Sequence, residues 1–246
     1  MTVLWFVTPA WQRYEMTAIC LEQRNRVIAE LAGQGIDAHQ VVIADDENLD
    51  IARSLGCATV ERDNEMVGRK FNDGMEYAGR NGADWIVPIG SDSWIDPAFF
   101  LPIPSIDVTR TSTLYAAVQL RRIAQLVVSP KNPDHMAGPY VFHRSLLEPA
   151  GFRPSAEDSV MVDTSTVSGI VRATGRGVPW KTHDVHPFQY VGFRVEPMMT
   201  SYHSLRRRWM VRERPEPWAL LRSYYPADLV ERARLAMEAN AREHVA

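Results

Sequence analysis

Apolar and polar positions change their period along the first hundred residues of the chain. Short continuous apolar runs, typical of buried strands, alternate with longer segments in which apolar residues recur at helical spacing. The predicted strands are 3–7, 38–44, 58–62 and 84–89, and the predicted helices are 15–31, 49–55 and 68–80. Strands that alternate with helices favour parallel pairing, so this part of the chain is expected to form a layered α/β sheet.

The pattern changes after Pro97. The predicted elements are two strand-like runs within 113–130, a strand and a short helix within 138–152, a helix over 163–175 and a mostly extended segment over 178–194. The tail beyond about residue 201 is predicted to be helical and charged, with a break at RPEPW (214–218). We therefore expect one α/β domain over residues 1–200 and a C-terminal helical extension over 201–246.

Composition agrees with this picture and excludes some classes of function. The 246 residues, 46% of them hydrophobic, suffice for one substantial α/β domain, and a net charge of −3 argues against binding nucleic acid through overall charge. Cys20 and Cys57 share no metal or redox spacing. The apolar start is too short for a signal peptide, and no later run is long enough for a membrane span. These features predict a soluble protein of the reducing cytoplasm.

Polar side chains follow three of the predicted strands. Thr8, Asp45 and Asp92 come directly after the apolar runs or within three residues of them. Because ligands of open α/β sheets collect at the carboxyl ends of the strands, these three residues indicate a binding site there. The alternative for Asp92 is a loop aspartate that caps the turn before Trp94, and for Asp45 a loop Asx-turn.

The start of the helix predicted over 68–80 carries a second group of candidates. Arg69 and Lys70 follow Gly68, and cations beside the free N–H groups of a helix start can bind an anion. Asn72 lies about one turn further on and could orient a nucleotide. The alternative is a solvated helix start with no ligand.

With these elements in place, the chain resembles a known family. The order strand, helix, strand ending in Asp-Asp, followed by GRKFNDGMEYAGRNGADWIVPIGSDSWIDP, is similar to the nucleotide-sugar half of GT-A glycosyltransferases of the family 2 type. The later GFRPSAEDSVMVDTSTVSGIVRATG resembles their acceptor half. The likeness covers roughly residues 3–195. One departure is that Gly90-Ser91-Asp92 stands where the family has Asp-x-Asp, so only the last carboxylate is retained.

The resemblance implies a fold and an activity. The fold would be a Rossmann-like three-layer sandwich with a mixed central sheet, with a nucleotide-sugar half over 1–97 and an acceptor half over 98–200. The activity would be inverting transfer of a hexosyl group from a nucleotide sugar, such as a UDP- or GDP-sugar, assisted by Mn²⁺ or Mg²⁺. The acceptor stays open among protein, lipid, glycan and modified nucleic acid. The donor-binding residues that it implies are Thr8, Pro9, Asp45, Arg69, Lys70, Asn72, Ser91 and Asp92.

The resemblance also suggests metal ligands and a general base. Asp92 would hold the cation, with His186 as a further ligand, although a lone histidine is more often structural or exposed. Asp163 is the first candidate for the base that takes the acceptor's proton, and Asp158 and Glu157 are its competitors. The alternative for Asp163 is a helix N-cap, a role compatible with catalysis.

Other functions remain open from the sequence. A sugar nucleotidyltransferase usually has a Gly-rich loop after its first strand, whereas TPAWQRYEM here contains no glycine. A decayed sugar-nucleotide-binding module is the third reading, because the acidic motif is incomplete. The arginine-rich run 204–214 is either a solvated helix face or a patch for a polyanionic acceptor that includes Arg206, Arg207, Arg208 and Arg212.

Overall fold

The computed structural model describes residues 1–101, 108–110, 114–120, 124–130, 140–158, 162–178, 181–182, 188–195, 212–214 and 216–243. The first part consists of β1 (Thr2–Pro9), α1 (Tyr14–Ala32), β2 (Ile36–Ala44), α2 (Asn48–Ser54), β3 (Ala58–Glu61), α3 (Val67–Arg80) and β4 (Trp85–Pro88). Every strand and helix predicted for this part is confirmed, with ends that differ by a few residues. Within the described ranges, the helices are too short or too polar to cross a membrane.

The second part mixes short strands and helices. Its elements are β5 (Ser93–Ile95), η1 (Pro97–Phe100), β6 (Val108–Arg110), β7 (Leu114–Leu120), β8 (Ala124–Pro130), β9 (Tyr140–His143), α4 (Arg144–Leu147), η3 (Glu148–Ala150), α5 (Val162–Thr174), β10 (Lys181–Thr182), β11 (Tyr190–Val195), β12 (Arg212–Arg214), α7 (Pro217–Leu221) and α8 (Ala227–Glu243). Sequence patterns predicted neither β5 nor β12. The expectation that the tail beyond about residue 201 is helical up to the break at 214–218 is wrong for 212–213, because these residues, together with Arg214, pair with β8 as an antiparallel strand.

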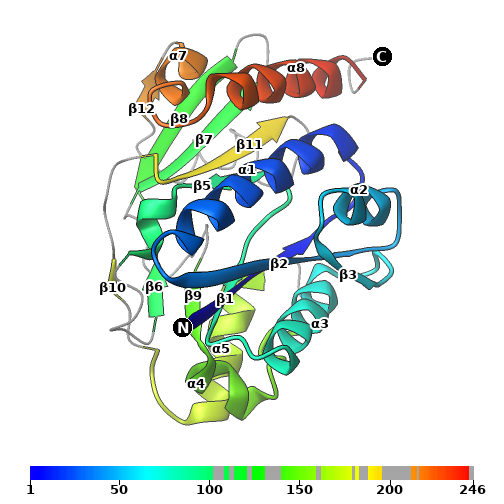
Figure 1. Ribbon diagram of the computed structural model, residues 1–246, viewed down its shortest axis with the longest axis vertical. Helices are drawn as coiled ribbons and strands as arrows, with labels where there is room; N and C mark the ends of the chain where they lie inside the picture. Colours follow the sequence, from blue (N-terminus) through cyan, green and yellow to red (C-terminus); the bar gives the residue numbers. More distant parts are fainter. Residues whose placement is uncertain are drawn as a thin grey trace.

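Within the described ranges, the strands form two sheets (Figure 1). The larger has seven strands in the order β10-β6-β9-β4-β1-β2-β3, and the smaller has five in the order β12-β8-β7-β11-β5. Strands β4, β1, β2 and β3 are mutually parallel, whereas β9 runs antiparallel to β4. The parallel order places the carboxyl ends of β1, β2 and β4 at one edge of the larger sheet, as expected from the alternation of strands and helices.

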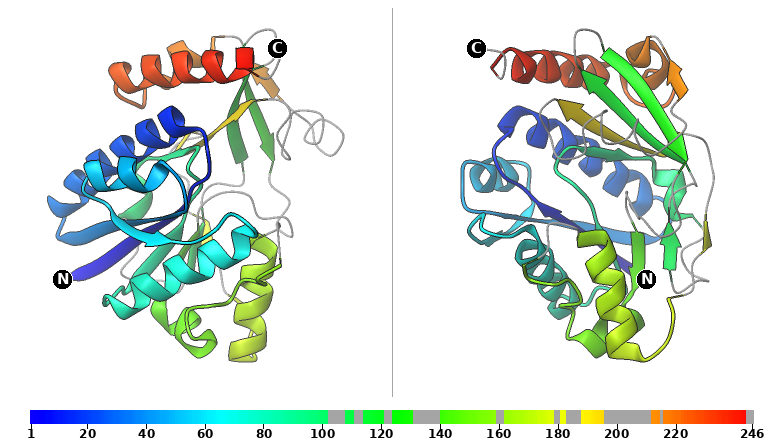
Figure 2. Two further views of the ribbon diagram at one scale, coloured as in Figure 1. Left: turned by 90° about the vertical axis from the view of Figure 1, so that its right-hand side faces the viewer. Right: turned by 180° about the vertical axis from the view of Figure 1, so that it is seen from behind.

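Side-chain alternation along β1 explains the layers. Leu4 and Phe6 face a core that includes Val27 and Leu31 of α1, while Trp5 and Val7 face a core built with α3 and α5. The central strand is therefore buried on both faces, which accounts for its continuous apolar run. Figure 2 shows α1 and α2 on one side of the larger sheet and α3, α4 and α5 on the other.

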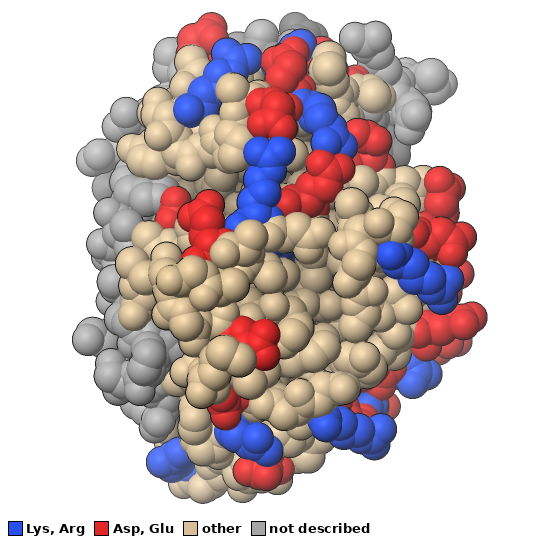
Figure 3. Space-filling view, viewed as in Figure 1, with Lys and Arg blue, Asp and Glu red and all other residues tan. Residues whose placement is uncertain are grey.

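The C-terminal helices pack on the outer face of α1. Trp218 of α7 and Leu229 and Val230 of α8 share a core with Met16 and Ile19 of α1. Two ion pairs also connect α1 to α8, one between Arg26 and Asp228 and the other between Glu22 and Arg232. In the view of Figure 3, positive and negative groups alternate over the upper part of the molecule, where α8 lies.

The close approach of α5 to the segment before it requires a glycine at position 169. A Cβ added at Gly169 would overlap the backbone carbonyl of Pro154, which cannot move as a flexible side chain could. We predict that Gly169→Ala lowers the free energy of unfolding by about 1–3 kcal/mol, as expected for an overpacked core. Gly177→Ala is the matched control, because a Cβ there meets nothing within 4 Å. Urea unfolding of both variants measures this, and equal midpoints would contradict the close packing.

Candidate functional site

Asp92 lies at the carboxyl edge of the larger sheet, just after β4. It is 8% exposed, and its backbone oxygen accepts a 2.8 Å hydrogen bond from the N–H of Phe193 in β11. Its Oδ2 lies 2.8 Å from Nη1 of Arg13, and its Oδ1 accepts a 3.1 Å hydrogen bond from the Ser93 hydroxyl. The Tyr190 hydroxyl lies 2.8 Å from Ser93 Oγ and can donate to it. The carboxylate is thus held in one orientation.

A buried arginine ties the ends of β1 and β4 together beneath Asp92. Arg24 of α1 has no exposed surface, and it donates hydrogen bonds to Thr8 Oγ1, to the Gly90 oxygen at 3.5 Å and to the Cys20 oxygen at 3.1 Å. These acceptors are all neutral. Burial lowers the pKa of the Arg24 guanidinium, and the nearby Asp92 carboxylate is among the groups that oppose this shift.

Residues 10–13, which we call the β1–α1 loop, cross the same edge. Lys70 of α3 is 1% exposed and donates a 2.8 Å hydrogen bond from Nζ to the Ala10 oxygen. Burial lowers the pKa of the Lys70 ammonium, and the nearby carboxylates of Asp45, Asp46 and Asp63 oppose that shift. A cation is therefore fixed beneath the loop, next to the predicted ligand edge.

The other predicted residues of this edge differ in their contacts. Asp45, at the end of β2, is exposed and accepts a 3.1 Å hydrogen bond from the Asn64 N–H. Its neighbour Asp46 makes more contacts, since it accepts from the Gln12 N–H at 2.9 Å and from the side chain of Asn48 at 2.8 Å. Pro9 and Ser91 are half-buried beside Thr8 and Asp92. The edge therefore brings together Thr8, Pro9, Asp45, Ser91 and Asp92, with Lys70 beneath the adjoining loop.

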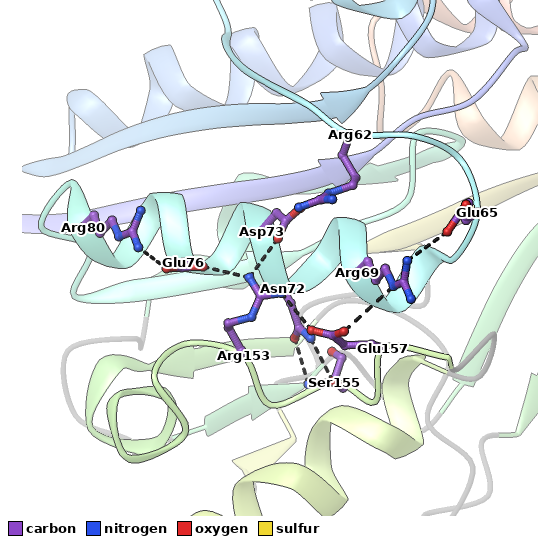
Figure 4. Close-up of polar contacts among 10 residues, drawn as sticks. All are labelled: Arg62, Glu65, Arg69, Asn72, Asp73, Glu76, Arg80, Arg153, Ser155 and Glu157. Atoms are coloured by element: carbon purple, nitrogen blue, oxygen red, sulfur yellow. Dashed lines mark hydrogen bonds and ion pairs between the residues drawn. The ribbon is translucent and has the colours of Figure 1, made fainter.

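Asn72 has a structural contact (Figure 4). Its side chain donates to the Ser155 oxygen at 2.9 Å and accepts from the Ser155 N–H at 3.0 Å. Both ends of this buried amide are thereby used to fix the segment before α5. Arg69, on the same helix, is half-buried and pairs with Glu65 at 2.9 Å and with Glu157 at 3.9 Å.

An ion-pair network joins α3 to the same segment. Asp73 accepts hydrogen bonds from Arg62, at the end of β3, and from Arg153 at 2.8 Å. Arg153 also lies 2.8 Å from Glu76 and 3.0 Å from Glu157. Burial alone would raise the pKa of the Asp73 carboxyl, but the hydrogen bonds from Arg62 and Arg153 outweigh it and hold the pKa below its usual value.

The candidate bases lie near this segment, but the structure describes them unequally. Glu157 is tied to two arginines, and Asp158 beside it is exposed. Helix α5 begins at Val162, so Asp163 lies in its first turn and the expected cap position is off by at least one residue. His186 and the arginines 206–208 lie outside the described residues.

Sequence reasoning missed the residues that hold Asp92. Arg13 and Arg24 belong to α1 and its N-cap, where the pattern suggested only a helix face. Tyr190 lies almost a hundred positions from Ser93 in the chain. Apolar periodicity carries no signal for such contacts, because they depend on which strand ends meet. A signal that could have pointed to Arg24 is its position at helical spacing from the apolar residues Cys20 and Val27.

The donor set at this edge suits a hard divalent cation. One carboxylate together with phosphate oxygens of a bound ligand is an arrangement that Mg²⁺ accepts, and Asp92 Oδ2 already binds a positively charged group, the Arg13 guanidinium. Among the described side chains, no group of three His, Cys, Asp or Glu gathers as a complete protein cage. Asp92 therefore fits a metal that substrate helps to hold.

No family model and no curated protein matches the sequence, whereas many solved structures match the fold. The mannosyltransferase PcManGT from Pyrobaculum calidifontis, solved with GDP-Man and Mn²⁺, is 15% identical, and the match covers 97% of this chain and 74% of that one, with a TM-score of 0.54. S. aureus TarS 1-349 is 11% identical over 78% of this chain and 60% of that one, with a TM-score of 0.53.

The 4-diphosphocytidyl-2C-methyl-D-erythritol synthase of Anaerococcus prevotii is 12% identical over 78% of this chain and 89% of that one, with a TM-score of 0.48. The matches to PcManGT and TarS confirm the expected fold class. The chain therefore has a GT-A fold, the α/β architecture of nucleotide-sugar transferases, with C-terminal helices packed on α1.

The network around Asp73 predicts how stability depends on pH. Because its pKa is lower in the folded state, its stabilisation is complete above the ordinary carboxyl pKa of about 3.9 and is lost as the pH falls through the folded value. Asp73→Asn should lower the free energy of unfolding at pH 7 by about 1.5–3 kcal/mol. As the pH falls from 5 to 2, the free energy of unfolding of this variant should decrease less than that of wild type.

Urea titrations across that pH range measure both effects. Asp50→Asn is the control, since its pair with Arg53 is exposed and its loss should change the free energy by no more than about 0.5 kcal/mol. Equal effects of the two substitutions at pH 7 would show that the Asp73 network does not stabilise the fold.

Proposed function

We propose that the chain is a glycosyltransferase that transfers a hexosyl group from a UDP- or GDP-sugar to an acceptor hydroxyl, with inversion and with the help of Mn²⁺ or Mg²⁺. The observation that carries the proposal is a nearly buried carboxylate, Asp92, in the turn that follows the carboxyl end of β4 in a chain with this fold. GDP-Man and Mn²⁺ in the PcManGT structure support the classes of donor and metal.

The proposed donor site uses the charges at this edge. Transfer leaves negative charge on the departing nucleoside diphosphate, and fixed cations that face it lower the barrier. A bound divalent cation would neutralise part of that charge, with Asp92 as its protein ligand. Lys70 adds a buried positive charge beneath the β1–α1 loop, and Thr8, Pro9, Asp45 and Ser91 line the same edge.

The proposed general base comes from the segment at the start of α5. Glu157 reaches Arg69 in the first turn of α3, so residues 155–158 lie beside the part of α3 that contains Lys70. Asp158 and Asp163 are the two carboxylates that we propose for this step, because Glu157 is already bound to arginines. One of them would take the proton from the acceptor hydroxyl as it attacks the anomeric carbon.

A screen of nucleotide sugars tests the proposal. We expect slow, metal-dependent release of UDP or GDP from one of them in the absence of an acceptor. Pyrophosphate formation from a nucleoside triphosphate and a sugar phosphate would identify a nucleotidyltransferase instead. Tight binding of a nucleotide sugar without any turnover would indicate a binding module.

The two aspartates that flank β4 provide a matched test of the metal site. Asp92→Asn should lower the rate of donor hydrolysis in Mn²⁺ by at least about 100-fold, because the substitution removes the charged metal ligand and leaves the fold of β4 unchanged. Asp84→Asn should leave hydrolysis unchanged, since Asp84 lies at the amino end of β4 and accepts a hydrogen bond from the Val3 N–H. Wild-type turnover by Asp92→Asn would make Asp92 a turn residue only.

A second pair of variants locates the base. Asp163→Asn should lower kcat for transfer by about 10²–10⁴-fold, the usual effect of losing a general base, with little change in donor affinity. Asp158→Asn is compared in the same assay and should retain most of the activity. The reverse outcome would assign the base to Asp158, and two fully active variants would exclude both residues.

A further inference from the structure

Arg13 holds the carboxylate that the proposed function assigns to the metal. Its Nη1 lies 2.8 Å from Asp92 Oδ2, and the two side chains are 39% and 12% exposed. An ion pair that is half closed to water is screened less than a surface pair. The guanidinium therefore occupies one side of the oxygen that a cation would approach.

The backbone of the β1–α1 loop presents Arg13 to that position. Gln12 and Arg13 have φ values of 53° and 51°, a left-handed conformation that residues other than glycine rarely adopt. Gln12 is fixed on the other side, because its N–H donates to Asp46 Oδ2 at 2.9 Å and its oxygen accepts from Asn48 at 3.2 Å. The loop thus spans the edge from β2 to β4, with Arg13 as its contact on the β4 side.

The charge balance around Asp92 also favours competition. Arg24 is fully buried beneath the same strand ends, and it adds a second positive charge near the Asp92 carboxylate. A divalent cation that arrives alone meets like charge from two arginines. A nucleoside diphosphate reverses this balance, since its phosphates attract both the metal and a guanidinium.

We propose that Arg13 and a divalent cation compete for Asp92, and that Arg13 moves from the carboxylate to the diphosphate when metal and donor bind together. The second half rests on the proposed function, whereas the competition itself concerns only Arg13, Asp92 and the cation. The consequence is that metal alone binds weakly and that metal and nucleotide increase each other's affinity.

Binding of Mn²⁺ alone to the full chain tests the competition without donor or turnover. Titration calorimetry, or electron paramagnetic resonance of free Mn²⁺, should show that Arg13→Gln binds Mn²⁺ about tenfold more tightly than wild type, a coupling of ordinary size. Arg53→Gln is the control, because it removes an exposed arginine from a 2.9 Å pair with Asp50 and should leave the affinity unchanged. Adding Asp92→Asn to Arg13→Gln should abolish the gain.

Several outcomes would overturn the proposal. The first is that Arg13→Gln binds Mn²⁺ no more tightly than wild type. The second is that the increase in Mn²⁺ affinity caused by Arg13→Gln persists when Asp92→Asn is added. Arg13→Lys, which keeps the charge, should stay within about threefold of wild type, and a gain as large as that of glutamine would also contradict it. Thermal unfolding confirms that each variant is folded. Tighter Mn²⁺ binding without any donor turnover would contradict the proposed function and not the competition.

Discussion

The ends of β1 and β4 are held together by one buried positive charge, and the candidate site depends on it. Removing a guanidinium from water is costly unless its donors are satisfied, and Arg24 meets that requirement with Thr8 Oγ1 and the Gly90 and Cys20 oxygens. The contact with the Gly90 oxygen fixes the chain two residues before Asp92. Asp92 therefore lies in a short turn between β4 and β5 whose preceding residues are anchored to α1.

The two parts of the chain meet along α3. Asn72 binds both backbone groups of Ser155, and Asp73 and Arg153 form the centre of an ion-pair network that includes Glu76. Lys70 lies two residues before Asn72 in the same helix. It donates a hydrogen bond to the Ala10 oxygen in the β1–α1 loop, which follows the carboxyl end of β1. The helix thereby connects the proposed donor edge to the segment that precedes α5.

The sequence predicted the first part of the fold because its strands are buried on both faces and its helices are amphipathic. The same alternation predicted that Thr8 and Asp92 share an edge, since parallel strands end together. It could not predict the Arg13–Asp92 pair, because the left-handed backbone at Gln12 and Arg13 has no local signal such as glycine. Short strands such as β5 and β12 were missed because their partners are distant in the chain.

A crystal structure of the chain with UDP or GDP and Mn²⁺, with the metal located by its anomalous scattering, tests most directly whether Asp92 holds the metal. We predict an anomalous peak within coordination distance of the Asp92 carboxylate and of the diphosphate, with the Arg13 guanidinium against a phosphate. A nucleotide bound away from the carboxyl ends of β1 and β4, or a metal that leaves the Arg13–Asp92 pair intact, would contradict it.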